Sequence, residues 1–336
     1  PVGPAPGVMR RDPVALLSIA AQDDRVGEPP RAALGKLPPR PGVYRFRDAG
    51  GRTLYVGRAA SLRARVRSYW GDLGDRPHLA AMVGRIARVE AVECASDHEA
   101  AWLERNLLER HLPPWNRTPG GQEVAVCIRL DGSARSAGLT VVHLSAATPR
   151  AAGAAGVHYF GPYLGGTRVR QAAAGLHRVL PLAYAAEHRS AVMADLARQR
   201  GIDGTDRREL LRALQAVLER DTAGVAGARR QLSARRDAAA AAESFELAGR
   251  IQAELAALDW ITSPQRAAAL NPADADIAGW ADGILVRFDV RGGMLLGWRQ
   301  FHRTRSEAEL LLAATPPDWR EFAQDNAELA ARLTYP

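Results

Sequence analysis

Residues 42–44 read Gly-Val-Tyr, residues 55–57 read Tyr-Val-Gly, and residues 48–51 between them read Asp-Ala-Gly-Gly. Both flanking runs have the alternating apolar pattern of strands, and the residues between them are typical of a turn. We therefore expect two strands joined by this turn. Each strand would carry one tyrosine, Tyr44 on the first and Tyr55 on the second.

The residues that follow predict a compact α+β unit around these strands. Ser61 is placed to cap a helix that runs to about residue 70, residues 77–88 predict another helix, and residues 89–95 predict a strand. Ser96 and Glu99 form a capping-box pattern at the start of a helix that ends near residue 111, before two prolines. We expect this unit to close near residue 118.

The rest of the chain predicts further segments, and the fold class expected for the whole is α+β. Residues 1–36 are rich in Pro, Gly and Ala and predict a disordered tail. The segments expected after residue 118 are a second α+β piece at 119–189, a helical region at 190–265 with a helical hairpin at 228–261, and a C-terminal segment at 266–336 with strands near 283–290 and 294–301 followed by helical sequence.

The composition favours a cytoplasmic protein with a polyanionic partner. The net charge is +8, and among the 45 basic residues only Lys36 is a lysine. Arginine binds phosphate bidentately, but a bias this strong is typical of G/C-rich codon use, so no single arginine can be interpreted as selected. Cys94 and Cys127 are too few for a disulfide framework and indicate reduced thiols. No apolar run approaches the roughly 20 residues that span a membrane.

Several motifs together indicate a family. The Gly42-Val43-Tyr44 and Tyr55-Val56-Gly57 runs resemble the paired signature of the GIY-YIG endonuclease family, with valine for isoleucine in both halves. Residues 55–69, and residues 104–108 with 114–116, are similar to the nuclease domain of the UvrC family, the endonuclease subunits of bacterial nucleotide excision repair. Segments 159–163, 240–254 and 286–297 resemble later parts of that family in the same order, so the resemblance covers about residues 37–301.

The resemblance implies one divalent cation, Mg²⁺ or Mn²⁺, held by Glu104. The sequence places this carboxylate beside the apolar stripe of its helix, where it is costly unless it is paired or ligating. The alternative is a salt bridge to one of the many arginines.

The resemblance also implies the other members of a catalytic site. Tyr55 would be the general base or its relay, and because a free phenol has a pKa near 10, nearby cations such as Arg58 and Arg65 would have to lower it. Arg65 could also bind the scissile phosphate, Tyr44 would form a hydrogen bond within the site, and Asn116 would support it. Arg58 stands where the family usually has lysine. Core packing is the alternative for either tyrosine.

Two further groups of residues are candidates for binding partners. The helix after the second motif offers DNA contacts, or simply a solvated face, through Arg63, Arg67, Tyr69 and Trp70. The predicted hairpin resembles the element by which UvrC docks onto its helicase-like partner, UvrB, and the residues expected to dock are Phe245, Glu246, Ala248 and Ile251. Five alanines at 238–242 replace larger residues there, so an ordinary packed hairpin is the alternative.

The sequence also departs from the family. Residues 181–184 contain no cysteine where the family has a cysteine cluster, so no iron–sulfur cluster is expected. The sequence also stops too soon after residue 301 for the RNase H-like nuclease and helix-hairpin-helix domains, so we expect a shortened form.

The leading hypothesis is a metal-dependent DNA endonuclease that makes a single incision in double-stranded DNA, damaged or distorted, in a process like nucleotide excision repair. The alternative is a non-catalytic DNA-repair accessory protein that binds DNA, a UvrB-like helicase or both. A mobile-element nuclease that reused the domain is a weaker third possibility.

Overall fold

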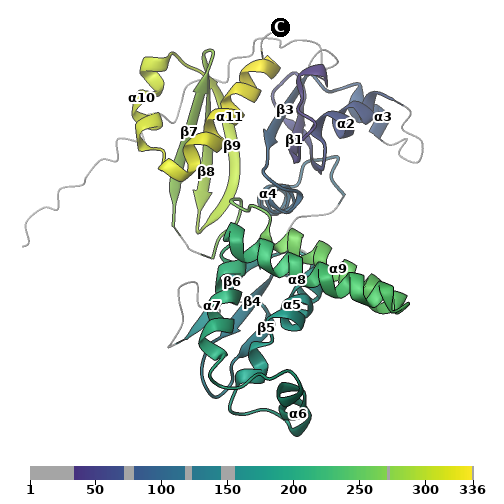
Figure 1. Ribbon diagram of the computed structural model, residues 1–336. Coiled ribbons are helices and arrows are strands. Elements are labelled where there is room, and N and C mark those ends of the chain that lie inside the picture. Colours follow the sequence, from purple (N-terminus) through teal and green to yellow (C-terminus); the bar gives the residue numbers. More distant parts are fainter. Residues whose placement is uncertain (1–33, 72–78, 118–122, 145–155, 271–272, 335–336) are drawn as a thin grey trace, which may run out of the picture.

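Three antiparallel sheets of three strands each organise the described part of the chain, and helices pack against each of them (Figure 1). The structure is a computed structural model that describes residues 34–71, 79–117, 123–144, 156–270 and 273–334. The predicted α+β class is confirmed. None of the helices among these residues combines the length and hydropathy needed to cross a membrane.

The first sheet has the order β2-β1-β3 and contains both tyrosine motifs. Its strands are β1 (Gly42–Arg47), β2 (Thr53–Ala59) and β3 (Arg88–Glu93), and its helices are α2 (Leu62–Arg67), α3 (Ala80–Val83) and α4 (Asp97–Arg110), with a 3₁₀ turn at Ser68–Trp70. The register pairs Tyr44 with Gly57 and Phe46 with Tyr55, so the two motifs lie side by side. The helix predicted at 77–88 is only one turn long among the described residues: it ends at Val83, with Gly84 as its C-cap, and β3 begins at Arg88.

The second sheet has the order β5-β4-β6, and five helices follow it. These elements are β4 (Val126–Asp131), β5 (Gly138–His143), β6 (Val157–Tyr163), α5 (Gly166–Val179), α6 (Ala191–Gln199), α7 (Arg207–Leu218), α8 (Thr222–Ala241) and α9 (Phe245–Thr262). Side chains from β4, α5, α7, α8 and α9 share one core, so the predicted division at residues 189/190 falls inside that core. The helical hairpin begins at Thr222, earlier than the predicted residue 228, because Asp221 caps α8.

The third sheet has the order β7-β8-β9 and packs against the first. Its elements are β7 (Ala275–Ala281), β8 (Ile284–Arg291), β9 (Met294–His302), α10 (Arg305–Ala314) and α11 (Pro317–Thr334). Strand β7 was not predicted, since small residues interrupt its apolar pattern. One of them is required: a Cβ on Gly279 would lie 1.9 Å from the carbonyl oxygen of Ala323, so α11 can approach the strand only at a glycine.

The structure describes only residues 34–36 of the predicted tail. Residues 1–33 lie outside the described residues. Leu34 already belongs to a short helical turn and is buried against the core of the first sheet, so order begins before the predicted residue 37.

A buried ion cluster joins the first sheet to the third. Glu90 on β3 is 2% exposed and pairs with Arg45, with Arg47 at 2.7 Å and with Arg88 at 2.8 Å. The guanidinium of Arg45 also lies 4.0 Å from the ring centroid of Trp298 on β9 and donates to its carbonyl oxygen at 2.9 Å. The cluster therefore holds β1 and β3 to β9.

We expect Glu90→Gln to lower the free energy of unfolding at pH 7 by about 3–5 kcal/mol, because it leaves buried guanidinium groups without their anion. The three arginines hold the pKa of Glu90 at about 2, although burial opposes them. A depressed carboxylate pKa stabilises the fold above the unfolded-state pKa near 4.5, and that stabilisation is lost as the pH falls toward 2. Urea unfolding of the wild type and of Glu90→Gln should therefore show a difference in the free energy of unfolding that is smaller at pH 3 than at pH 4.5. An equal difference at both pH values would contradict this.

Candidate active site

Three tyrosines meet between the first sheet and the 3₁₀ turn that follows α2. Tyr44 and Tyr55 come from the adjacent strands β1 and β2, and Tyr69 comes from the 3₁₀ turn after α2. The hydroxyl oxygens of Tyr44 and Tyr69 are 2.8 Å apart. The ring centroid of Tyr69 lies 5.9 Å from that of Tyr44 and 6.0 Å from that of Tyr55. The structure thus brings the tyrosines of both motifs into one cluster.

Arg65 on α2 is the cation beside this cluster. Its guanidinium lies 5.6 Å from the ring centroid of Tyr69, and its charge interacts with the hydroxyls of Tyr44, Tyr55 and Tyr69. Arg65 lowers the pKa of Tyr55, as predicted, but burial raises it further than Arg65 lowers it. The net pKa of Tyr55 therefore lies above the ordinary value, contrary to the prediction that cations bring it down.

Glu104 on α4 lies across from the second motif. One carboxylate oxygen accepts the backbone N–H of Arg58 at 3.1 Å, and the other lies 3.1 Å from Nε of the same residue. The Glu104 side chain is 23% exposed, and burial raises its pKa although Arg58 opposes that shift. The salt bridge that the sequence left as an alternative is therefore present.

The donor set at Glu104 fits a hard divalent cation. Among the residues that the structure describes, no three carboxylate, imidazole or thiolate groups gather at one point. A single carboxylate is consistent with the usual coordination of Mg²⁺, which keeps several water ligands and binds through one or two carboxylates together with substrate phosphates. The Arg58 side chain is 48% exposed, so it can leave the carboxylate without opening the core.

Asn116 supports the strand that carries the second motif. Its Oδ1 accepts the Val56 N–H at 3.0 Å, and its Nδ2 donates to the Val56 carbonyl at 2.8 Å. The side chain thereby extends the sheet along the free edge of β2. Asn116 thus holds the backbone of Val56, the residue between Tyr55 and Gly57 of the second motif.

The four residues predicted to contact DNA lie in different environments. Tyr69 is 1% exposed and belongs to the tyrosine cluster, so its predicted role as a DNA contact is wrong in this structure. Arg63 donates through Nε to the Leu37 carbonyl at 2.7 Å. Arg67 is exposed, and Trp70 is half-buried with its ring centroid 5.8 Å from that of Phe46. The hydrogen bond between the Tyr69 and Tyr44 hydroxyls joins residues 25 apart in the chain, so only the fold reveals it.

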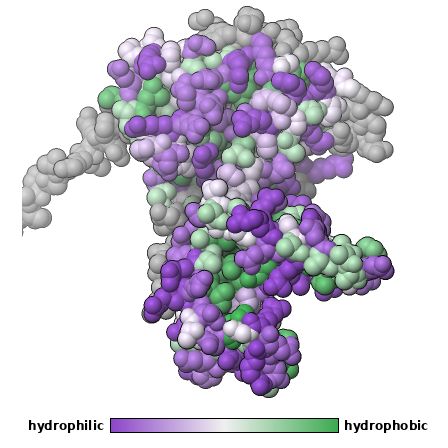
Figure 2. Space-filling view, in the orientation of Figure 1, coloured by the Kyte–Doolittle hydropathy of each residue, from purple (hydrophilic) through white to green (hydrophobic). Residues whose placement is uncertain are grey.

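The residues predicted to dock a partner divide between the tip of the hairpin and its core. The α8–α9 hairpin projects from the molecule, and the space-filling view shows hydrophobic side chains near its end (Figures 1 and 2). Phe245 is 70% exposed, Glu246 is exposed and Ala248 is half-buried. Ile251 is 2% exposed within the core shared with α5, so the prediction that it docks a partner is wrong. Leu247, 39% exposed, is an apolar tip residue that was not predicted.

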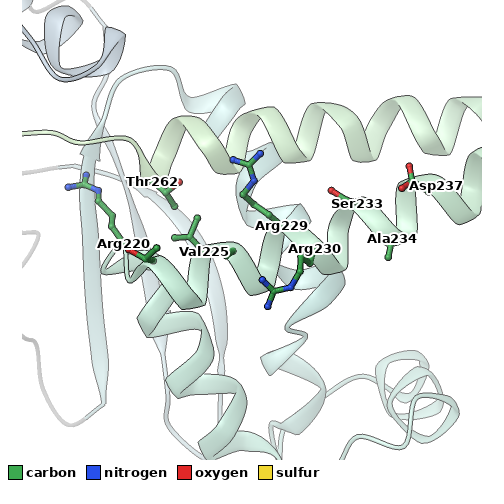
Figure 3. A pocket seen from close by; sticks show the side chains of 10 residues that line it. Arg220, Val225, Arg229, Arg230, Ser233, Ala234, Asp237 and Thr262 are labelled. Carbon is green, nitrogen blue, oxygen red and sulfur yellow. The ribbon is translucent and has the colours of Figure 1, made fainter.

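A concave surface lies along α8, away from the tyrosines. This pocket of about 790 Å³ is lined by Arg220, Arg229 and Arg230, among others (Figure 3). Arg229 is paired with Asp259 at 2.7 Å, and the three arginines point in different directions. They therefore do not converge on one ligand, and the tyrosine cluster with Glu104 remains the better candidate for chemistry.

The glycine of the second motif makes the cluster possible. A Cβ at Gly57 would lie 2.5 Å from the Tyr44 hydroxyl oxygen and 2.8 Å from Cε1 of Tyr55. We expect Gly57→Ala to lower the free energy of unfolding by about 1–3 kcal/mol through overpacking. Because it displaces both rings, it should also lower DNA nicking by about 10- to 100-fold, measured with Mg²⁺. Gly50→Ala is the control, since the nearest atom to its Cβ is 3.5 Å away; equal losses in both variants would contradict this account.

The fold and the site define a class of domain. A family model described as the UvrC-like GIY-YIG domain matches residues 40–117, which contain the tyrosine cluster, Glu104 and Asn116. Residues 40–117 therefore belong to the UvrC-like GIY-YIG domain family, and the family resemblance of these motifs is confirmed.

Beyond this domain, the chain is similar to proteins named UvrABC system protein C. The protein of Desulforudis audaxviator is 32% identical over 314 residues, which cover 87% of this chain and 49% of that relative. The protein of Symbiobacterium thermophilum is 31% identical over 281 residues, which cover 79% and 43%. The chain thus spans about half, or less, of the length of these relatives.

The chain is also similar in sequence to a solved structure. It is the GIY-YIG N-terminal endonuclease domain of UvrC from Thermotoga maritima, bound to its catalytic divalent cation, magnesium, and it is 30% identical. The match covers 26% of this chain and 93% of that chain, with a TM-score of 0.24.

Proposed function

We propose that this protein is a metal-dependent endonuclease that hydrolyses one phosphodiester bond in DNA. The observation that carries the proposal is the position of Glu104: a largely buried carboxylate held by the Arg58 amide in the domain of the tyrosine cluster. Charge that develops on a phosphate during hydrolysis is stabilised best by cations fixed in advance in a partly dry site.

Each residue of the site has a distinct role in this proposal. Glu104 would hold Mg²⁺ or Mn²⁺, which supplies Lewis-acid stabilisation of the phosphate oxygens when bound. Tyr55 would accept a proton from the attacking water as its phenolate, or, as a neutral phenol, would relay that proton by releasing its own to solvent. Arg65 would bind the scissile phosphate beside the tyrosines, while Tyr44 and Asn116 hold the rings and β2 in place.

The substrate and partner follow from the relatives rather than from the site alone. Because the similar proteins are named as component C of a UvrABC system, we propose double-stranded DNA, damaged or distorted, as the substrate. The exposed tip of the hairpin, with Phe245 and Leu247, would dock a UvrB-like helicase.

Nicking of a duplex that contains an unpaired bubble tests this proposal. Purified protein with Mg²⁺ or Mn²⁺ should convert one labelled strand into a single shorter product, and chelation by EDTA should stop the reaction. Addition of a UvrB-like partner should increase the rate, and Phe245→Ala should remove that increase but leave nicking without the partner unchanged.

The salt bridge between Arg58 and Glu104 favours one other function. If that pair persists, the carboxylate is neutralised and the protein is a non-catalytic accessory that binds DNA or the helicase. This alternative predicts tight binding to the same bubble duplex with no product at any metal concentration.

A further inference from the structure

Helix α4 has two faces with different partners, and Glu104 lies on only one of them. Glu99 and Asn106 are seven residues apart and share a face, whereas Glu104 lies about 140° around the helix from Glu99. Glu104 reaches toward β2, where it meets the Arg58 N–H at 3.1 Å. The face with Glu99 and Asn106 turns away from β2.

The first turn of α4 is held by residues 264–268, the segment that precedes the third sheet. The Ser96 hydroxyl donates to the carbonyl of Pro264 at 2.5 Å. The Glu99 carboxylate, 1% exposed, accepts the N–H of Arg266 at 2.6 Å and that of Ala95 at 2.7 Å. Ser96 caps the helix as predicted, but the Glu99 side chain bonds to Ala95 and to a distant segment rather than to the Ser96 amide that a capping box would use.

The middle of α4 is held by the same segment and by β9. Asn106 is 2% exposed, and its Nδ2 donates to the carbonyls of Ala267 at 3.0 Å and Leu295 at 3.1 Å. The Leu295 N–H in turn donates to the Ala267 carbonyl at 2.8 Å. The side-chain amide of Asn106 therefore lies at the point where residues 264–268 pair with β9.

We propose that residues 264–268 and strand β9 are a positioning element for Glu104, acting through Glu99 and Asn106. The inference rests on the proposed function of Glu104 and deepens it. The hydrogen bonds fix both the rotation of α4 and its position along its axis, so they determine where the Glu104 carboxylate stands relative to β2. This element lies outside the residues that match the GIY-YIG domain model, which ends at residue 117. Partners that orient a metal-binding side chain commonly contribute a large part of metal affinity.

A pair of matched variants tests the inference. Asn106→Leu removes the amide that holds α4. Asn326→Leu removes an equally buried amide that joins α11 to β3, where it accepts the Glu93 N–H at 2.7 Å and donates to the Glu93 carbonyl at 3.2 Å. Both variants loosen the contact between the first and third sheets, but only Asn106→Leu loosens α4.

The measurements are the Mn²⁺ dissociation constant, by electron paramagnetic resonance, and kcat and KM for nicking. We expect Asn106→Leu to weaken Mn²⁺ binding and lower kcat by about 10-fold or more, with KM for DNA unchanged. Asn326→Leu should leave all three values at the wild-type level, although it lowers the melting temperature. Should Asn106→Leu fail to fold, Glu99→Gln replaces it, because it keeps the shape and one acceptor oxygen, and the same split is expected.

The outcomes separate this inference from the proposed function. If Asn106→Leu, or Glu99→Gln in its place, binds Mn²⁺ and turns over as Asn326→Leu does, the positioning role is overturned while the proposed function stands. If the wild type neither binds Mn²⁺ through Glu104 nor nicks DNA, both are overturned.

Discussion

Replacing Glu104 by glutamine is expected to lower the nicking rate by about 10²- to 10³-fold, while the affinity for the bubble duplex stays near the wild-type value. Metal stabilisation of the transition state contributes several kcal/mol, and each 1.36 kcal/mol is a factor of ten in rate. Glutamine keeps the shape and one acceptor for the Arg58 N–H, so the fold should be retained. Single-turnover nicking with Mg²⁺ and a binding titration measure the two quantities.

Glu109→Gln is the matched control for this prediction. Glu109 lies on the same helix and also pairs with an arginine, Arg105 at 3.0 Å, but its side chain is 53% exposed. It lies about 140° around the helix from Glu104. It should nick at the wild-type rate. Undiminished nicking by Glu104→Gln would mean that this carboxylate is only the salt-bridge partner of Arg58, and the proposed mechanism would be wrong.

Tyr55→Phe should lower the nicking rate by about 10²- to 10⁴-fold and change the shape of its pH profile. Burial raises the pKa of Tyr55 above its ordinary value, so the phenol is almost fully protonated at neutral pH. If the phenolate is the base, then below that pKa each increase of one pH unit raises the phenolate fraction about tenfold. The wild-type rate should therefore rise steadily from pH 7 to pH 9. The Tyr55→Phe rate should be nearly flat over the same range.

Tyr163→Phe provides the control, because Tyr163 is also a buried tyrosine whose pKa is raised, to about 12, but it lies in the second sheet. Its pH profile should match that of the wild type. A Tyr55→Phe variant that keeps the wild-type slope would assign the proton transfer to another group.

Some predictions that depended only on neighbouring residues were accurate. The two strands with Tyr44 and Tyr55 follow from alternation around a turn, and Ser96 caps α4 because a cap is recognised within a few residues. Contacts between distant segments could not be predicted this way. The pairing of Glu104 with Arg58 depends on how α4 crosses β2, which no local pattern encodes.

Burial explains most of what the sequence missed. Ile251 and Phe245 both lie on α9, but the end with Phe245 is exposed and Ile251 packs in the core shared with α5, so of these two residues only Phe245 is available to a partner. The pKa of Tyr55 was expected to fall because arginines are close, yet the loss of hydration in the core has the larger effect. A sequence shows which charges are near in the chain, but not how much water the fold removes.

The most direct test of the account is the location of Mn²⁺ in crystals of the wild-type protein, by anomalous scattering. We expect one ion about 2.1 Å from a carboxylate oxygen of Glu104, with the Arg58 side chain moved away and water as the remaining ligands. An ion bound elsewhere, or a Glu104 that stays paired with Arg58 in saturating Mn²⁺, would contradict it.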